Sequence, residues 1–296
     1  MSHSAQRVRP GLAWAAPALL FFGLFALAPI VGVVYLSFTQ WGGLGAPQWV
    51  GLDNWAAMPN DPQLWNGIRT SLILTGLSWV FQSFLALTLG VWAAGRQRNR
   101  AVLSSIFFLP LLLSSAAIAL LWRALLDPNF GVATSLGQLL GIGSVNVLGS
   151  QNLALYAVTF VILWQFMPFH MLLYQAATRQ IPGVLYDAAV VDGAGRMRQF
   201  LSITLPQLRD TIIASSVLIL VGSLVYFENV LLLTGGGPGT ATRVLPLHMY
   251  IEGFRAFDMG YASAIAVLLV VAGAGLSLLV VRVTGYSRMA SQREGL

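Results

Sequence analysis

The sequence has no cysteine and no lysine, and it has few charged residues of any kind. Charged side chains make up 9% of its 296 residues, whereas a soluble globular domain usually carries about 25%. The missing cysteines exclude disulfides, thiolate metal sites and a cysteine nucleophile. With 57% hydrophobic residues and a mean hydropathy of +0.75, the chain has too little charge to cover a water-facing surface. Lipid is therefore its expected solvent.

Several catalytic and ligand-binding signatures are also missing. The phosphate-binding loop G-x-x-x-x-G-K-[ST] needs a lysine, so the glycine-rich stretch 235–239 is not expected to bind nucleotide. The three histidines (His3, His170 and His248) lie in different segments, and no H-E-x-x-H motif for zinc is present. No G-x-S-x-G nucleophile motif occurs either. These absences disfavour an enzyme and predict no catalytic residue, no metal and no cofactor bound by this chain.

Long apolar stretches dominate the chain, and crossing a bilayer core takes about 20 of their residues in helical form. Six stretches qualify: 12–38, 71–94, 103–125, 152–177, 211–234 and 261–283. The first is too long for the apolar region of a signal peptide, which spans roughly 7–15 residues, so we expect it to be a retained span. The sequence therefore predicts an all-α polytopic membrane protein with six transmembrane helices, forming a single transmembrane domain over residues 1–296.

Arginine supplies all sixteen basic residues, and its distribution predicts the orientation in the membrane. Twelve arginines lie in one alternate set of loops and tails: Arg7, Arg9, Arg96, Arg98, Arg100, Arg179, Arg196, Arg198, Arg209, Arg282, Arg288 and Arg293. The other set holds Arg69, Arg123, Arg243 and Arg255. The positive-inside rule places the richer set, and with it both termini, in the cytoplasm. Because the arginines are scattered between apolar runs, membrane topology explains them better than a nucleic-acid partner does.

The longest predicted cytoplasmic loop, residues 179–210, has the pattern of a small helix–turn–helix. Pro182 suits the first turn of a helix, where its missing N–H is not needed. Gly193 suits the end of that helix, because glycine accepts the backbone angles of a C-terminal cap. A second short helix is expected over 196–202 and should end at Pro206. Taken alone, such a segment is equally consistent with an amphipathic loop lying at the lipid headgroups.

The same loop resembles the coupling loop, often called the EAA loop, of bacterial binding-protein-dependent ABC importers. The pattern E-A-A-x-x-x-G followed by I-x-L-P is filled by Asp187-Ala188-Ala189, Gly193 and Ile203–Pro206. Aspartate stands where the family usually has glutamate, which keeps the charge on a shorter side chain. The resemblance implies that this loop docks onto an ATPase subunit. It assigns that role to Tyr186, Asp187, Ala188, Ala189, Asp192, Gly193, Ala194, Phe200 and Pro206.

Other segments resemble the MalF-like subunit of carbohydrate importers. Residues 233–264, with Leu-Thr-Gly-Gly-Gly-Pro-Gly at their start, resemble the stretch between its spans five and six. Residues 50–55 with Trp65-Asn66 resemble the segment before its span two, and Trp122 with Asp127 resembles the end of its span three. The resemblance covers nearly the whole chain.

This resemblance implies a type-I ABC importer permease fold and transport of a mono- or oligosaccharide by alternating access in the cytoplasmic membrane. The implied partners are a second, MalG-like permease subunit, a dimer of ATPase subunits that binds the ATP, and an extracytoplasmic solute-binding protein. Membrane lipid surrounds the complex, and no nucleic acid takes part.

Polar residues inside the spans are candidates for the substrate path, because burying them in lipid is costly. We predict this role for Gln165, His170, Tyr226, Glu228 and Asn229. Gln82 in the second span is a further polar residue of this kind. The competing interpretation is that these groups bond neighbouring helices or sit at a membrane interface.

Two alternative transport functions remain open. Permeases for glycerol-3-phosphate or another polar solute resemble the sugar permeases, but an anionic solute favours arginine in its path, and only Arg123 lies near one. A stand-alone secondary transporter needs an intramembrane carboxylate for its coupling ion, and Glu228 is the one candidate.

Overall fold

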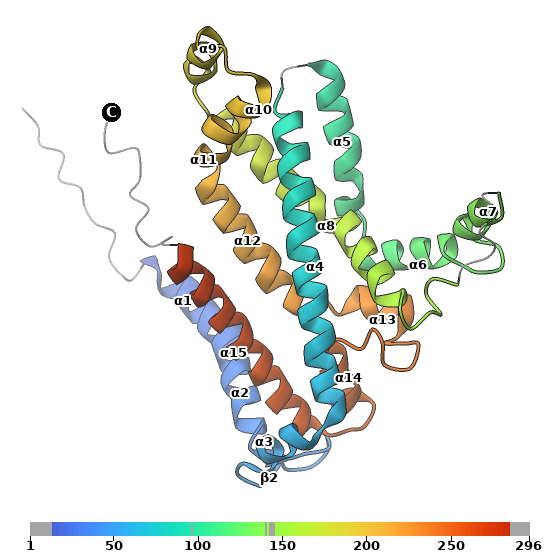
Figure 1. Cartoon of the computed structure of the whole chain (residues 1–296). Helices are drawn as coiled ribbons and strands as arrows, with labels where there is room; N and C mark the ends of the chain where they lie inside the picture. Colours follow the sequence, from blue (N-terminus) through green and yellow to red (C-terminus); the bar gives the residue numbers. More distant parts are fainter. Residues whose placement is uncertain (1–13, 96, 140, 142–145, 285–296) are drawn as a thin grey trace, which may run out of the picture. The chain divides into compact units, whose positions relative to one another are not determined.

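The computed structural model describes residues 14–95, 97–139, 141 and 146–284 (Figure 1). The described residues form two compact units, one within 14–60 and 249–268 and one within 61–248 and 269–284. Helices make up most of both units, and the described residues contain one pair of two-residue strands. This confirms the all-α prediction.

The first unit begins with an apolar helical segment over residues 16–36, made of α1 (Ala16–Phe22), the π-helical turn η2 (Gly23–Leu27) and α2 (Ala28–Leu36). Its 21 residues are long and apolar enough to cross a membrane, as predicted for the described part of 12–38. The strands β1 (Thr39–Gln40) and β2 (Gln48–Trp49) follow, then α3 (Asp53–Ala57) and the 3-10 turn η3 (Met58–Asn60). The side-chain amide of Asn54 donates to the carbonyls of Ser37 and Thr39 and so holds α3 against the end of α2.

The second unit holds most of the helices. They are α4 (Pro62–Ala93), α5 (Arg98–Leu112), α6 (Ser115–Leu125), α7 (Val132–Leu139), α8 (Ala154–Arg179), α9 (Gly183–Val191), α10 (Arg196–Gln199), the π-helical turn η4 (Phe200–Thr204), α11 (Leu205–Gln207), α12 (Arg209–Leu224) and α13 (Glu228–Thr234). Two helices, α14 (Leu245–Phe254) and α15 (Met259–Thr284), run through both units.

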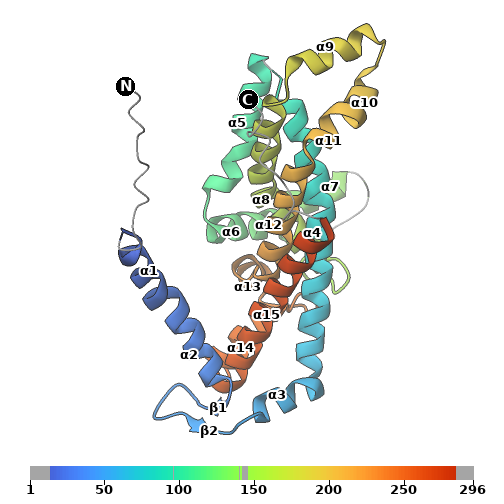
Figure 2. The same cartoon turned by 90° about the vertical axis from the view of Figure 1, so that its left-hand side faces the viewer.

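Close packing of α4 against α8 forms the core of the second unit (Figures 1 and 2). Gly90 permits this approach, because a Cβ there would lie 2.6 Å from the carbonyl oxygen of Met171 and 2.7 Å from Cβ of Tyr174. Ala86 packs with Met171 and Tyr174 in the same buried cluster. Small residues at a helix contact let the backbones approach, which is how helices associate where lipid removes the hydrophobic driving force.

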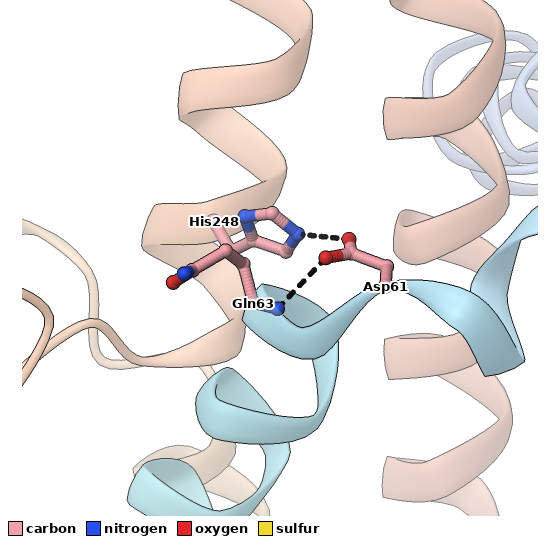
Figure 3. A network of polar contacts seen from close by, with 3 residues as sticks. All are labelled: Asp61, Gln63 and His248. Carbon is pink, nitrogen blue, oxygen red and sulfur yellow. Dashed lines mark hydrogen bonds and ion pairs between the residues drawn. The ribbon is translucent and has the colours of Figure 1, made fainter.

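Helix α4 begins earlier than residue 71, the predicted start of the second span. The Asp61 carboxylate caps it by accepting a hydrogen bond from the backbone N–H of Gln63 at 2.7 Å, and Pro62 occupies its first turn. These are favoured residues for a helix start. The other oxygen of the Asp61 carboxylate lies 2.9 Å from Nε2 of His248, a buried side chain on α14 (Figure 3). The cap therefore also ties α4 to α14.

Two predicted continuous spans are broken in the structure. Span 103–125 bends by 100° between α5 and α6, because Leu113 and Ser114 are extended and the Ser114 hydroxyl caps α6. Span 211–234 is interrupted after Leu224, and a separate helix starts at Glu228. In the described part of the chain, four helical segments are long and apolar enough to cross a membrane, or up to six when each bent pair counts as one span.

Some residues on which the sequence predictions rest, most of them arginines used for the orientation, lie outside the described residues. Those positions are His3, Arg7, Arg9, Arg96, Arg288 and Arg293, together with both chain ends. The cytoplasmic location of the termini stays a prediction.

Candidate functional site: the coupling loop and the polar groups of the spans

The predicted coupling loop, residues 179–210, contains the expected helix–turn–helix. Its first helix, α9, follows Pro182 and ends at Asp192, and Gly193 adopts a left-handed conformation with φ of +72°. The N–H of Gly193 donates to the carbonyl of Val190, and the N–H of Ala194 donates to that of Ala189. This pair of bonds is the Schellman motif, which satisfies the last carbonyls of a helix. The predicted helix end at Gly193 is confirmed.

The second helix of the loop is longer than predicted. The segments α10, η4 and α11 run without a break from Arg196 to Gln207, so the prediction that Pro206 ends the helix is wrong. The π-helical turn just before Pro206 has the wider i to i−5 hydrogen bonding, which accommodates a residue without an N–H. The chain turns at Leu208 instead, where the axes of 196–207 and α12 differ by 68°.

Two side-chain contacts hold the halves of the loop together. The hydroxyl of Tyr186 on α9 lies 2.9 Å from that of Thr204 in η4. The side-chain amide of Gln199 donates to the carbonyl of Ala194 at 2.8 Å, which closes the turn between the helices. Because η4 continues through α11 to the turn before α12, the Tyr186–Thr204 contact joins α9 to the segment that leads into α12.

The surface of the loop has the character of a docking site. In both views α9 and α10 lie at the same end of the second unit as the end of α4 and the start of α5 (Figures 1 and 2). A cavity of about 410 Å³ opens between α9 and the second helix, and its lining includes Ala188, Ala189, Asp192 and Ala194. Large apolar side chains are exposed around it: Val184, Val190, Val191 and Met197. Clustered exposed apolar residues on a protein surface mark an interaction site.

The remaining residues assigned to the loop divide between surface and interior. Asp187 and Pro206 are exposed, whereas Tyr186 and Phe200 are partly buried. Within the described part of the chain, the carboxylates of Asp187 and Asp192 accept no hydrogen bond and form no ion pair. Both are therefore available to a partner.

The polar residues predicted for the substrate path are tied to neighbouring helices. The Asn229 amide on α13 donates to Oε1 of Gln165 on α8 at 2.9 Å, and both side chains are 3% exposed. Nε2 of Gln165 in turn reaches Ser115 Oγ at the bend between α5 and α6. His170 Nδ1 lies 2.9 Å from Ser215 Oγ on α12.

The other two candidates, Tyr226 and Glu228, lie at the break between α12 and α13. Tyr226 stacks on Phe166 of α8 with ring centroids 5.2 Å apart, and Glu228 is exposed at the start of α13. Gln165, Tyr226, Glu228 and Asn229 thus lie around one helix break, whereas His170 lies further along α8.

Sequence reasoning identified Gln82 but missed its neighbours on α4. Thr75, Ser78 and Gln82 are buried, and the polar atoms of these side chains have no hydrogen-bond partner among the residues that the structure describes. Their spacing of three and four residues places them on one helical face. That spacing, inside a stretch otherwise rich in apolar residues, was a usable signal.

Hydrogen bonds also join the first turns of α4 to the glycine-rich loop, two segments already singled out from their sequences. The side-chain amide of Asn66, in the first turns of α4, donates to the carbonyl of Thr240 in the glycine-rich loop at 2.9 Å. The Ser71 hydroxyl accepts from the N–H of Leu245. Inside the loop, Thr242 is buried, lies 2.7 Å from the Thr234 hydroxyl and donates to the carbonyl of Gly237. These contacts hold the glycine-rich loop against the first turns of α4.

Comparison with known families decides what kind of membrane protein carries this loop. The family model described as binding-protein-dependent transport system inner membrane component matches residues 86–286, which include all of the coupling loop. The chain belongs to this family. As a family member with several apolar helices, it is a multi-pass membrane protein and a component of a transport system.

Individual relatives agree with this assignment. The probable ABC transporter permease protein YurN of Bacillus subtilis is 34% identical over 89% of this chain and 91% of its own length. The diacetylchitobiose uptake system permease protein NgcF of Streptomyces coelicolor is 30% identical over 97% of this chain and 86% of its own. A chain of the bacterial alginate ABC transporter, solved in complex with an alginate pentasaccharide-bound periplasmic protein, matches with a TM-score of 0.81 and 25% identity over 90% of this chain and 91% of that one. The fold is that of a type-I permease, as predicted.

Proposed function

We propose that this chain is the MalF-like permease subunit of an ATP-driven importer that carries a sugar across the cytoplasmic membrane by alternating access. The coupling loop carries the proposal. It combines a fixed turn at Gly193, exposed apolar side chains and two carboxylates that have no partner among the described residues, all on one helix pair. A loop of this composition needs a protein partner to cover it.

An ATPase subunit is the partner that this geometry suits. Two such subunits dock at the coupling loops of a permease pair, and they bind the ATP, so this chain itself needs no cofactor. The Tyr186–Thr204 contact makes α9 and η4 one lever, and the lever leads into α12. Movement of the ATPase subunits then tilts α12 and changes access to the solute path.

The sugar assignment rests on the relatives and on the residues around the helix break. Diacetylchitobiose and alginate, named for two relatives, are both saccharides. A stacked Tyr226–Phe166 pair beside the Gln165 and Asn229 amides supplies the aromatic and hydrogen-bonding groups that sugar binding uses. An extracytoplasmic binding protein delivers the sugar to the outer loops. The partner permease is MalG-like, and both termini face the cytoplasm.

Reconstitution tests this proposal. The chain is co-expressed with a MalG-like permease, an ATPase and a binding protein encoded beside it, and the complex is purified and placed in proteoliposomes. We expect solute uptake that requires internal ATP and ATP hydrolysis that rises when the loaded binding protein is added. Uptake by the isolated chain without ATP would instead identify a secondary transporter. In that case Glu228→Gln abolishes uptake, whereas an ATP-driven permease retains ATP dependence in this variant.

A further inference from the structure

A second cavity, distinct from the docking surface, lies where the coupling loop meets the ends of the spans. It has a volume of about 330 Å³ and is bounded by the end of α4, the start of α5, the end of α8 and the helices of the loop. Among the described residues, three arginines line it, Arg100, Arg179 and Arg196, and no acidic residue does. Three cations around one cavity repel one another unless an anion lies between them.

Neighbouring groups accept hydrogen bonds from two of these three guanidinium groups. The Arg100 guanidinium donates to the carbonyl of Trp92 at 2.8 Å and to the Gln97 side chain, and Arg179 reaches the carbonyls of Ala93 and Ala94 at 3.5 and 3.4 Å. Each guanidinium has five N–H donors, so most of them remain free. The Arg196 side chain is exposed, and its guanidinium has no hydrogen bond or ion pair within the described residues. The hydrogen bonds to the carbonyls at the end of α4 therefore do not account for the charge of Arg196.

The surroundings of the cavity are typical of the edge of a membrane. The Trp92 ring is partly exposed and lies 5.3 Å from the Arg100 guanidinium carbon. Tryptophan and arginine together favour the headgroup layer. Exposed apolar side chains continue along the Arg100 face of α5 at Leu103 and Phe107. An acyl chain can lie along this face while its headgroup enters the cavity.

From this arrangement we propose that the cavity binds the phosphate group of an anionic phospholipid. Arginine binds phosphate through paired, charge-assisted N–H donors, and basic pockets between transmembrane helices hold lipid headgroups. Placing the cavity at the cytoplasmic leaflet rests on the proposed function. The bound phosphate joins α4, α5 and α8 to Arg196 of the coupling loop, so the lipid fixes the position of the loop against the spans.

The test uses Arg196→Gln, with Arg198→Gln as the matched control. Both arginines lie on α10, but Arg198 lines the docking cavity instead. The complete co-expressed complex is purified from membranes containing phosphatidylglycerol, and bound lipid is counted by native mass spectrometry. We expect roughly fivefold weaker phosphatidylglycerol binding in Arg196→Gln and an unchanged value in Arg198→Gln. Equal loss in both variants, or none in either, overturns the proposal.

Two further arms identify the source of the phosphate and separate this site from the transport assignment. Inorganic phosphate is titrated at constant ionic strength, and competition with phosphatidylglycerol confirms recognition of the phosphate group itself. Binding of inorganic phosphate without retained lipid assigns the site to a soluble anion and overturns the lipid source. If Arg196→Gln loses the ATPase subunit but retains its lipid, Arg196 contacts protein instead. This outcome also overturns the lipid proposal. Lipid counts in preparations that lack any ATPase test the site even if the transport proposal fails.

Discussion

The hydroxyl of Tyr186 lies 2.9 Å from the hydroxyl of Thr204 and thereby joins α9 to the helix that leads into α12. Thr204 is buried, so this bond is shielded from water. A net contribution of about 0.5–1.5 kcal/mol is typical of such a hydrogen bond. Its position matters more than its strength, because it joins α9 to the segment that leads into α12.

Removing this bond should loosen the coupling of ATP hydrolysis to transport. We expect Tyr186→Phe and Thr204→Val each to lower the amount of solute carried per ATP hydrolysed in proteoliposomes. The double variant should carry as much solute per ATP as the single variant with the larger loss, because both changes remove the same interaction. Tyr156→Phe is the control, since Tyr156 is exposed and forms no hydrogen bond within the described residues. Strictly additive losses would contradict the account.

Packing between α4 and α8 gives a prediction about stability. Gly90→Ala places a methyl group against the backbone of Met171, and overpacking of this kind costs about 1–3 kcal/mol. Gly76→Ala, on the same helix, meets no atom within 4 Å and should be neutral. Unfolding of the purified protein in mixed micelles compares the two. Equal stability of the two variants would mean that α4 and α8 are further apart than in the structure.

Asp61 should stabilise the start of α4 through two separate contacts, the helix cap and the contact to His248. Asp61→Ala removes both the helix cap and the contact to His248, with an expected cost of about 1–3 kcal/mol. Asp61→Asn keeps a good capping residue, so it should cost less. Thermal unfolding of both variants in the same detergent measures the difference. If Asn is as damaging as Ala, the contact to His248 dominates and the cap contributes little.

The Gln165–Asn229 contact separates a structural from a solute-binding role. Gln165→Leu leaves the buried Asn229 amide without its acceptor. The double variant Gln165→Leu with Asn229→Leu should therefore lose less stability than the two single variants lose in sum. Bonds between transmembrane helices average roughly 0.6 kcal/mol, so the coupling is small. Micellar unfolding measures it, and uptake assays give the apparent solute affinity. Unchanged stability with altered affinity would assign the pair to the solute path alone.

The sequence predicted features that depend on local chemistry. The turn at Gly193 followed from one glycine, and four spans were evident from their apolar length. It did not predict the bends within the third and fifth spans, because apolar composition is the same on both sides of Ser114 and Val225. Those breaks depend on which neighbouring helix satisfies the freed polar groups. The start of α4 at Pro62 was predictable, since Asp-Pro is a local signal for a helix start.

The partners of the candidate site residues depend on tertiary structure. Gln165 and Asn229 are 64 residues apart, and no local pattern indicates that they meet. The three-arginine cavity gathers residues from three loops or helix ends, and positive-inside counting explains those residues only as topology signals. In contrast, Asn66 and Thr240 lie in segments whose resemblance to one subunit had already selected them.

The most direct test of the coupling loop compares Gly193→Val with Gly195→Val. A Cβ at either position meets no atom within 4 Å, but Gly193 has a φ of +72° and Gly195 one of −67°. Valine is therefore strained at the first position alone. The measurement is recovery of the ATPase subunit with each purified variant. The account predicts normal recovery with Gly195→Val and loss of the ATPase with Gly193→Val, whereas equal recovery with both would contradict docking through this turn.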